Sequence, residues 1–472
     1  MDTSSKLYTP LLLVTSVLGL VIIFYGLGTP ELMSLNEGRR ALAIKEMFQG
    51  GDWLLPHLNG ELYLSKPPLL YWIAVSFACI SGGVNEWIVR LPSALAAVAI
   101  LCMMYKYAAK NFGAWPALFT VQLLLINASF AMLARRAEIE MLLTCLCVGS
   151  LLSALIYIQE QGGRRWIYLS YFLLALAVLT KGPVALLFVT LPLIASAVWL
   201  RDTRVKDVLT SIPGWAILLL VGMSWYAVVT WQLGPDIWAQ IARKDMLGKM
   251  QAEEVAKPLL SYLGWIAVDF LLLVVLLLVK PKAWFISIKD RKECIVLVMA
   301  ILLPLLVFSL FSNKHTKYLL PVYPFIALVL ATRMAGLYKE CGAKPRLMIL
   351  VAGIMLPLLY AIYYAFVEQK YFDYRVSAFP LFHAWTTGIP QPNLYAYNGI
   401  DSRLIYYSAK PVNELNENQL AGLKIGHQSA LILVEGTTSV GDVVDCRLKE
   451  FKPYLKKHKS LVVYGIGAAC HG

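Results

Sequence analysis

The sequence predicts an all-α polytopic membrane protein with a small α/β domain at its C-terminal end. The chain has 472 residues, of which 59% are hydrophobic and only 15% charged, whereas soluble globular proteins carry about 25% charged residues. Apolar windows such as 11–28 and 212–230 approach the roughly 20 residues that a helix needs to cross a bilayer. From about residue 367 the long apolar runs stop and the charge rises, which indicates a separate polar domain.

The apolar runs locate the membrane-spanning helices, of which we expect about 11 to 13. The first run is too long for a signal peptide and no small-residue cleavage site follows it, so we interpret it as a retained span. The predicted spans are 10–28, 90–108, 116–134, 141–158, 167–180, 184–200, 212–230, 262–280, 294–311, 319–335 and 347–366.

The basic loops predict the orientation. Lysine and arginine gather in short loops such as 201–207 and 333–346, as is typical of cytoplasmic loops. The formal charge of +13 therefore reflects orientation and does not indicate nucleic-acid binding. The loop 29–66 falls on the opposite, periplasmic face of a bacterial inner membrane. If the short run 67–81 crossed the membrane fully, every later basic loop would lie on the periplasmic face. We therefore expect a helix embedded at the outer leaflet or a tilted span.

The polar C-terminal part predicts a small periplasmic α/β domain over 367–472, after a transmembrane domain over 1–366. Cys446 and Cys470 lie in this part and could pair in an oxidising compartment. The predicted strands are 394–397, 431–434 and 461–464, and the predicted helices are 414–423 and 445–456.

The loop 29–66 is unusually rich in charge for so apolar a chain. Each of its nine charged side chains would cost about 2.5 to 3.5 kcal/mol in lipid, so they must contact water, one another or a polar ligand. Ser34 and Glu37 have the spacing of a capping box, and apolar residues at helical spacing predict an amphipathic helix over 35–49 on the membrane surface. Taken alone, Glu37 is a helix cap, and Arg39 and Arg40 contact lipid head groups.

Further charged residues are expected on the same face. Acids there could accept a proton from an attacking hydroxyl, and cations could hold a phosphate leaving group. Ionisable groups at the membrane edge are a functional site by default, although transporters also carry them. No phosphate-binding glycine loop is present. Nucleotide-activated donors are not expected on the outer face of a bacterial inner membrane, so a phosphate-bearing substrate is expected to be lipid-linked. The ionisable residues expected on this face are Lys66, Arg135, Arg136, Glu138, Glu140, Lys181, Lys314, His315 and Lys317, with the hydroxyl of Tyr318 beside them.

Four stretches resemble family 39 glycosyltransferases of the C-type membrane fold, which include bacterial aminoarabinose (lipid A) transferases and protein O-mannosyltransferases. They are NEGRRALAIKEMFQGGDWLLPHLNGELYLSKPPLLYW (36–72), ARRAEIEMLLT (134–144), LTKGPVALL (179–187) and SNKHTKYLLPVYPFIAL (312–328). The resemblance covers most of the membrane part. It implies an inverting sugar transfer from a polyprenyl-phosphate carrier, by a carboxylate of the first periplasmic loop.

The resemblance also implies roles for individual residues. Members usually begin the motif with an Asp-Glu pair, where this chain has Asn36 and Glu37. An amide cannot act as a base, so Glu37 is the first catalytic candidate and Glu140 the second. The implied substrate-binding residues are Asn36, Arg39, Arg40, Tyr63, Lys66, Arg135, Lys181, Lys314 and Tyr318.

The expected function is transfer of a sugar from an undecaprenyl-phosphate-linked donor to a cell-envelope acceptor such as lipid A or another lipid glycan. A protein O-glycosyltransferase and a lipid-phosphate transporter or flippase remain alternatives. No cofactor is required by the sequence. A divalent metal ion could lie between Glu37, Glu140 and the donor phosphate, but no ligand spacing demands one.

Overall fold

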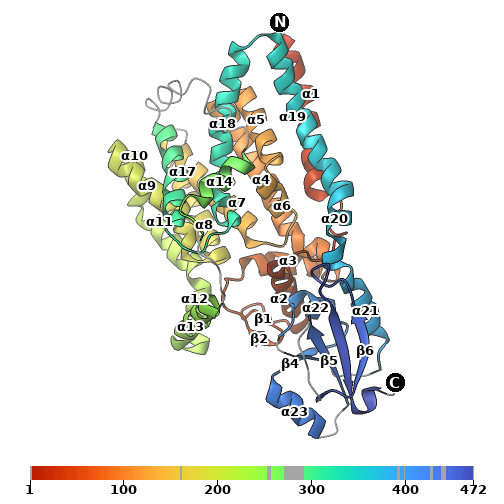
Figure 1. Ribbon diagram of the computed structural model, residues 1–472. Helices are drawn as coiled ribbons and strands as arrows, with labels where there is room; N and C mark the ends of the chain where they lie inside the picture. The colour runs from red at the N-terminus through yellow and green to blue at the C-terminus, as the bar shows by residue number, and fades with distance from the viewer. Residues whose placement is uncertain are drawn as a thin grey trace. The chain divides into compact units, whose positions relative to one another are not determined.

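The computed structural model describes residues 3–159, 162–251, 257–270, 292–390, 394–397, 399–425, 429–436 and 443–470. The elements form two compact units, each built from separated stretches of chain (Figure 1). Unit 1 comprises Met1–Tyr25, Leu64–Ile73 and Arg90–Ile362, and unit 2 comprises Gly26–Tyr63, Ala74–Val89 and Tyr363–Gly472. The first loop thus shares a unit with the C-terminal region, while the predicted division into 1–366 and 367–472 stays a prediction.

Unit 1 is built from helices. Within it α1 lies beside α19, α5 beside α18, and α7 beside α8 (Figure 1). Two further helices, α3 (Leu69–Ser81) and α4 (Glu86–Asn111), begin or end in unit 2. The elements of unit 1 are α1 (Thr3–Phe24), α5 (Ala114–Leu125), α6 (Ala128–Ala134), α7 (Ile139–Ile158), α8 (Arg165–Lys181), η1 (Pro183–Ala185), α9 (Leu186–Leu200), α10 (Thr203–Leu209), α11 (Ile212–Ile217), η2 (Leu218–Gly222), α12 (Ser224–Leu233), α13 (Asp236–Gln251), α14 (Ser261–Asp269), α17 (Lys292–Ser309), η3 (Thr316–Val322), α18 (Tyr323–Glu340) and α19 (Ala343–Ile362).

The helices confirm a multi-pass membrane protein. Among the described residues, 8 helices are long and apolar enough to span a bilayer, or 9 if a bent pair counts as one span. The predicted span 262–280 is described only through residue 270, and its remainder lies outside the described residues. The run 67–81 forms a short apolar helix, α3, and its depth in the membrane stays a prediction.

The expected span 116–134 is sharply bent. The sequence predicts a single helix over 116–134, but α5 and α6 meet at a bend of 71°. The reason is Asn127, whose side chain accepts the backbone N–H of Phe130 at 2.9 Å and so starts a new helix. Apolar periodicity does not reveal this break because both pieces are apolar.

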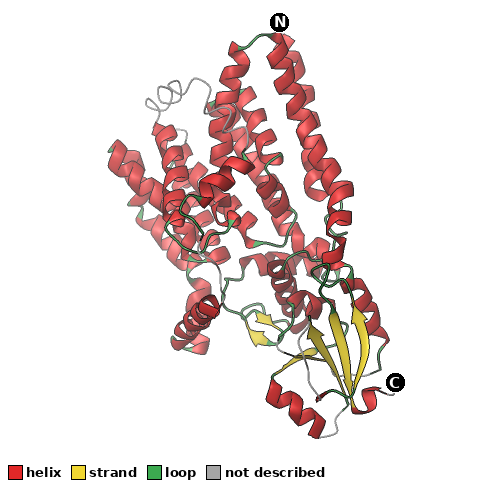
Figure 2. Cartoon of the chain, in the orientation of Figure 1, coloured by secondary structure: helices red, strands yellow, loops and turns green. Residues whose placement is uncertain are grey.

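Unit 2 contains all the described strands of the molecule (Figure 2). A five-stranded mixed sheet has the order β4-β3-β5-β7-β6, with β3 parallel to β4 and β5, and β7 antiparallel to β5 and β6. The elements are α2 (Leu35–Gly50), β1 (His57–Leu58), β2 (Glu61–Leu62), η4 (Tyr363–Val367), α20 (Glu368–Val376), α21 (Ala378–Gly388), β3 (Leu394–Tyr397), α22 (Ser402–Tyr407), β4 (Val412–Leu415), α23 (Glu417–Ile425), β5 (Ala430–Glu435), β6 (Cys446–Phe451), β7 (Leu461–Ile466) and η6 (Gly467–Cys470).

The three predicted strands are confirmed as β3, β5 and β7, but the predicted helix 445–456 is wrong. Its first half is the edge strand β6, which pairs with β7. Its polar side chains, which favoured a helix, are exposed on the sheet edge, where charge is ordinary for a strand. The predicted helix 414–423 begins later, as α23, after β4. Cys446 and Cys470 form a disulfide bond.

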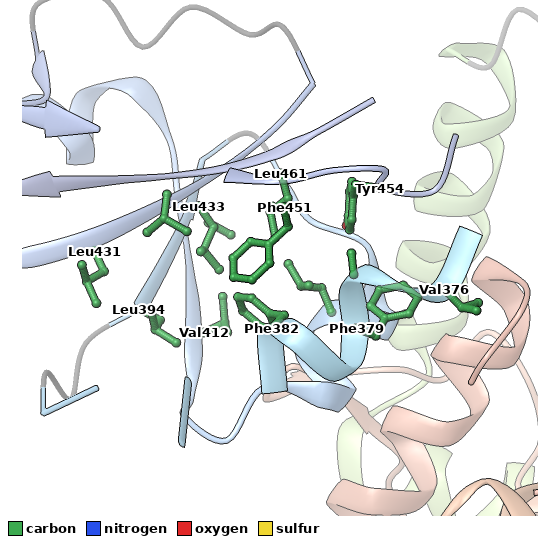
Figure 3. Close-up of a cluster of buried hydrophobic side chains, with 14 of the residues drawn as sticks. Val376, Phe379, Phe382, Leu394, Val412, Leu431, Leu433, Phe451, Tyr454 and Leu461 are labelled. Carbon is green, nitrogen blue, oxygen red and sulfur yellow. The ribbon is translucent and has the colours of Figure 1, made fainter. Parts of the chain in front are cut away.

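The core of unit 2 lies between the sheet and α21. Phe379 and Phe382 project from α21 toward side chains of the sheet, including Phe451 (Figure 3). Alternation along the strands sends Leu431 and Leu433 to this face and their neighbours to the other. Met33, from the loop before α2, is part of the same core, so the first loop and the C-terminal region share one hydrophobic interior.

Candidate active site

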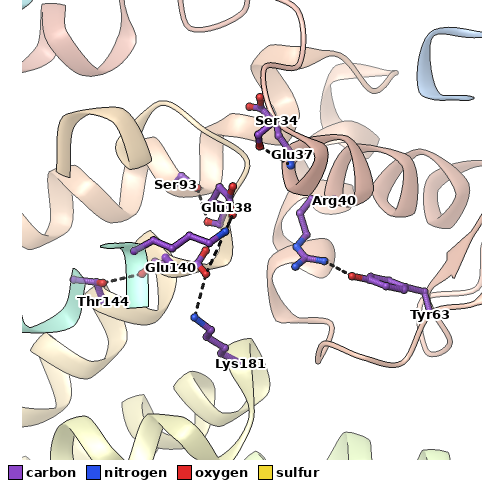
Figure 4. A network of polar contacts seen from close by, with 10 residues as sticks. Ser34, Glu37, Arg40, Tyr63, Ser93, Glu138, Glu140, Thr144 and Lys181 are labelled. Atoms are coloured by element: carbon purple, nitrogen blue, oxygen red, sulfur yellow. Dashed lines mark hydrogen bonds and ion pairs between the residues drawn. The ribbon is translucent and has the colours of Figure 1, made fainter. Parts of the chain in front are cut away.

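The Glu37 carboxylate is mounted on the first turn of α2. The backbone N–H of Glu37 donates to Ser34 Oγ at 3.1 Å, and Glu37 Oε2 accepts the backbone N–H of Met33 at 2.7 Å. The predicted cap therefore forms, with the carboxylate reaching back over the start of the helix (Figure 4). Glu37 is fully buried, which fixes the carboxylate far better than an exposed acid would be fixed.

The helix α2, which the sequence predicts as an amphipathic helix on the membrane surface, is largely covered by protein. It is buried on more than one side, including at Arg40, and it packs against α22. The two helices approach closely because Gly38 has no side chain. A Cβ at this position would lie 2.5 Å from Arg403 Cγ and 3.0 Å from the Arg403 backbone nitrogen. Apolar residues at helical spacing indicate a buried face but not what covers it, so the alternative of lipid head groups around Arg40 is wrong.

Two predicted substrate-binding residues meet beside α2. Arg40 Nη1 donates to the Tyr63 hydroxyl at 2.8 Å, and the guanidinium lies 5.8 Å from the Tyr63 ring centre (Figure 4). Further along, Lys45 Nζ donates to the Tyr406 carbonyl at 2.7 Å. Burial lowers the pKa of Lys45, and the charge of Glu46 opposes that shift. Asn36 and Arg39 are half-buried on the same helix.

A buried ion pair of the C-terminal region lies against the start of α2. Arg403 and Asp401 form two hydrogen bonds, from Nε at 2.9 Å and from Nη2 at 2.7 Å, and Arg403 Nη1 donates to the Met33 carbonyl at 3.0 Å. Burial alone would lower the pKa of Arg403, but Asp401, with smaller contributions from Tyr454 and Glu37, raises it. The sequence did not predict Arg403 or Asp401 as site residues, because an arginine or an aspartate in a polar domain is usually exposed to solvent.

The second predicted carboxylate, Glu140, belongs to unit 1 and lies among cations. Lys181 Nζ is 3.0 Å from Glu140 Oε1 (Figure 4). Lys317 Nζ is 2.9 Å from Glu138 Oε2 and 3.8 Å from Glu140 Oε1. Lys181 also lies 4.8 Å from the Tyr318 ring centre. The structure therefore brings together five residues that the sequence predicts on one face: Glu138, Glu140, Lys181, Lys317 and Tyr318.

Three other predicted cationic side chains donate hydrogen bonds to backbone carbonyls. Arg135 Nη1 donates to the carbonyls of Ile22 at 2.7 Å and Tyr25 at 2.9 Å, at the end of α1. Lys314 is buried, and its ammonium donates to the carbonyls of Phe311 and Lys257. Lys66 donates to the Ser65 carbonyl at 2.9 Å. These bonds give Arg135 and Lys314 a structural explanation, and their role at a phosphate stays a prediction.

The predicted site residues fall into two groups, one in each unit. Unit 2 holds Asn36, Glu37, Arg39, Arg40 and Tyr63, and unit 1 holds Lys66, Arg135, Glu140, Lys181, Lys314 and Tyr318. No group of three or more His, Cys, Asp or Glu side chains suited to a metal ion occurs in the described part of the chain. A metal ion shared by Glu37 and Glu140 stays a prediction.

Comparison with known proteins shows what this chain is similar to. Residues 65–231 match the model of the dolichyl-phosphate-mannose-protein mannosyltransferases, and residues 257–391 match the Alg9-like mannosyltransferase family. An uncharacterized protein of Aquifex aeolicus is 25% identical over 412 residues, which cover 86% of this chain and 90% of that one. An undecaprenyl phosphate-alpha-4-amino-4-deoxy-L-arabinose arabinosyl transferase of Pseudomonas aeruginosa is 30% identical over 319 residues, which cover 65% of this chain and 55% of that one.

The fold extends over nearly the whole chain of a solved structure. The crystal structure of ArnT from Cupriavidus metallidurans bound to undecaprenyl phosphate superimposes with a TM-score of 0.77, at 17% identity and with 98% of both chains covered. The protein therefore has the C-type membrane glycosyltransferase fold. It is similar to the aminoarabinose transferases and the O-mannosyltransferases, which confirms the resemblance in the sequence. It spans little more than half the length of the curated aminoarabinose transferases that it matches.

Proposed function

We propose that the protein transfers a sugar from an undecaprenyl-phosphate-linked donor to lipid A or another cell-envelope lipid glycan. In this proposal transfer occurs at the periplasmic face of the inner membrane and inverts the anomeric carbon. The observation that carries the proposal is the 30% identity over 319 residues with an arabinosyl transferase whose name gives an undecaprenyl-phosphate donor. The capped, buried carboxylate of Glu37 in the first loop supports it.

The proposed step is a single displacement at the sugar. The acceptor oxygen attacks the anomeric carbon, the bond from that carbon to the phosphate oxygen breaks, and the polyprenyl phosphate leaves with the bonding electron pair. Glu37 takes the proton of an acceptor hydroxyl, and lysines and arginines stabilise the charge that develops on the phosphate. An acceptor that is itself a phosphate is ionised near neutral pH and would need the carboxylate less.

The unit 1 cluster supports a phosphate-binding role for its lysines. The side chains of Lys181 and Lys317 are 14% and 19% exposed, whereas those of Glu140 and Glu138 are 3% and 7% exposed. The acids are thus covered and the ammonium groups are the more accessible partners. A phosphate can bind to such lysines. A carboxylate already paired with two cations is less available to an acceptor hydroxyl. This arrangement favours Glu37 as the base and Glu140 as the residue that orients the lysines.

A protein acceptor is the second candidate. It is favoured by the match of residues 65–231 to a model of protein mannosyltransferases. The two candidates share the donor chemistry and differ in the acceptor, so a single assay separates them.

The experiment is transfer by the purified full chain in lipid nanodiscs. Polyprenyl-phosphate-linked pentose and hexose donors are offered with lipid A or with a mixture of periplasmic peptides, and products are identified by mass spectrometry. We expect a sugar on the lipid acceptor. Sugar on peptide alone would favour the second candidate, and a folded protein that consumes no donor with any acceptor would contradict the enzyme proposal.

A further inference from the structure

We propose that Arg403, held by Asp401, is a positioning residue that fixes the Glu37 carboxylate through the peptide groups of Met33. The inference rests on the proposed function, in which Glu37 is the base. It assigns part of the reaction to the C-terminal region of unit 2, whose residues contain none of the predicted catalytic groups.

Met33 is held at three points. Its N–H donates to Glu37 Oε2 at 2.7 Å, its carbonyl accepts from Arg403 Nη1 at 3.0 Å, and its side chain is buried in the core that contains Phe379 and Leu404. The residue before it is also held, because the Leu32 N–H donates to the Tyr407 hydroxyl at 2.9 Å. The peptide group that bonds the carboxylate therefore lies between two neighbouring peptide groups that side chains of α22 hold.

The Arg403 side chain is itself held in place, so it can fix the position of the Met33 carbonyl. Its guanidinium forms a two-point pair with Asp401, and it lies 5.5 Å from the ring centre of Phe379. A planar guanidinium in such a fork has little freedom left. Asp401 is fixed in turn, because its backbone N–H donates to Glu435 Oε1 at 2.8 Å, and that oxygen also accepts from the Tyr454 hydroxyl at 2.6 Å. The chain of contacts thus runs from the sheet to the start of α2.

The Arg403 side chain also approaches α2 directly. Gly38, the residue after Glu37, leaves just the space that Arg403 Cγ and its backbone nitrogen occupy. The guanidinium and the Glu37 carboxylate both bond to Met33, and the charge of Glu37 makes a small contribution to the raised pKa of Arg403. Removing the guanidinium would therefore change both the place of the carboxylate and the ease with which it loses its proton.

A positioning role differs from a merely structural one in what it changes. A displaced base slows the chemical step while donor affinity is kept, because a shift of about 1 Å can cost about a hundredfold in rate. Loss of the buried cation also makes the ionised carboxylate less favourable, so the base protonates at a higher pH. Loss of folded protein would instead lower the amount of active enzyme and leave KM and the pH profile unchanged.

The test compares Arg403→Gln and Arg403→Lys in the full chain with Arg447→Gln. Arg447 is an exposed arginine of β6 paired with Glu450 in the same unit, so it matches the change in charge away from α2. For Arg403→Gln we expect kcat to fall about tenfold to a hundredfold with donor KM within about twofold, and the acid limb of kcat/KM to move to higher pH. Arg403→Lys keeps the charge, so it should restore most of the pH profile but not kcat.

Hydrogen exchange of residues 32–38 gives a readout that needs no transfer activity. We expect faster exchange in Arg403→Gln and no change in Arg447→Gln. Wild-type kcat, pH profile and exchange in Arg403→Gln would overturn the proposal, as would a loss of activity that merely follows the unfolded fraction. If the wild type transfers no sugar, the proposed function fails. In that case hydrogen exchange alone tests whether Arg403 orders residues 32–38. Exchange rates in Arg403→Gln equal to those of the wild type would overturn the positioning role.

Discussion

Glu37 caps α2 in the structure and is the base of the proposed reaction. As an acceptor for the Met33 N–H it stabilises the start of α2, and as a buried carboxylate it can take a proton. The two roles are compatible, since a cap that fixes a carboxylate also provides the rigid mount that a catalytic group needs. Because glutamine keeps a carbonyl oxygen for the Met33 N–H but cannot accept a proton, substitution separates the roles.

For Glu37→Gln we expect normal expression and a fall in transfer of about 10² to 10⁴-fold, the usual contribution of a general base. Initial rates with an excess of a hydroxyl acceptor measure it. Glu46→Gln is the matched control on the same helix, because Glu46 accepts the N–H groups of Asn59 and Gly60 in the adjoining hairpin. Wild-type turnover in Glu37→Gln would assign the base to Glu140 or remove the need for one.

For Lys66→Ala we expect weaker donor binding. A hydrogen bond to a charged group is worth about 1.5 to 3 kcal/mol, which corresponds to a rise in donor KM of roughly tenfold to a hundredfold, with acceptor KM unchanged. Lys106→Ala, which removes an exposed lysine of α4, serves as the control. Equal donor KM in both variants would mean that Lys66 does not bind the donor and that its hydrogen bond to the Ser65 carbonyl is only structural.

At the scale of elements, the pairing of α2 with α22 is the feature that the sequence could not supply. The spacing of Ser34 and Glu37 predicts the cap, and the apolar positions predict the helix, because both signals are local. The partner of α2 lies more than 360 residues away along the chain, and no periodicity encodes a contact over that distance. The same limit explains β6, whose polar residues indicate an exposed face but do not distinguish an edge strand from a helix.

Gly38→Ala tests the close approach of α2 and α22. A Cβ at 3.0 Å from backbone cannot be relieved by turning a flexible side chain, so we expect a loss of stability of about 1 to 3 kcal/mol, seen as a lower thermal midpoint. Gly50→Ala is the control, since that position has open space around it on the same helix. Equal midpoints would contradict the packing of Arg403 against the helix.

At the scale of the whole molecule, composition predicts the class and the comparisons confirm the fold. The number of spans is harder to predict from the sequence. A bend such as that between α5 and α6, and the depth of a short helix such as α3, depend on how the helices pack. The site was predicted in part. Motif residues such as Glu140 and Lys181 are indeed neighbours, whereas Arg403 and Asp401 lie outside every motif.

The orientation proposed for the molecule makes a prediction about topology. Reporter fusions after Lys110 and Arg204 should report the cytoplasm, because the sequence places both residues in basic stretches between predicted spans. A fusion after the C-terminal region should report the periplasm, where the Cys446–Cys470 bond is favoured. A cytoplasmic signal from the C-terminal fusion, or periplasmic signals after Lys110 and Arg204, would contradict the orientation.

The bond between Arg403 and Met33 joins residues 370 positions apart. At the usual ribosomal rate of about 5 to 20 residues per second, roughly 20 to 70 seconds separate the synthesis of the two partners. During that interval the first loop has already left the ribosome without the contacts that fix its carboxylate. A nascent chain, or a truncated one ending before Arg403, would carry every motif residue of the loop and still lack the Arg403–Met33 bond, so the start of α2 is completed only after α22 has been synthesised.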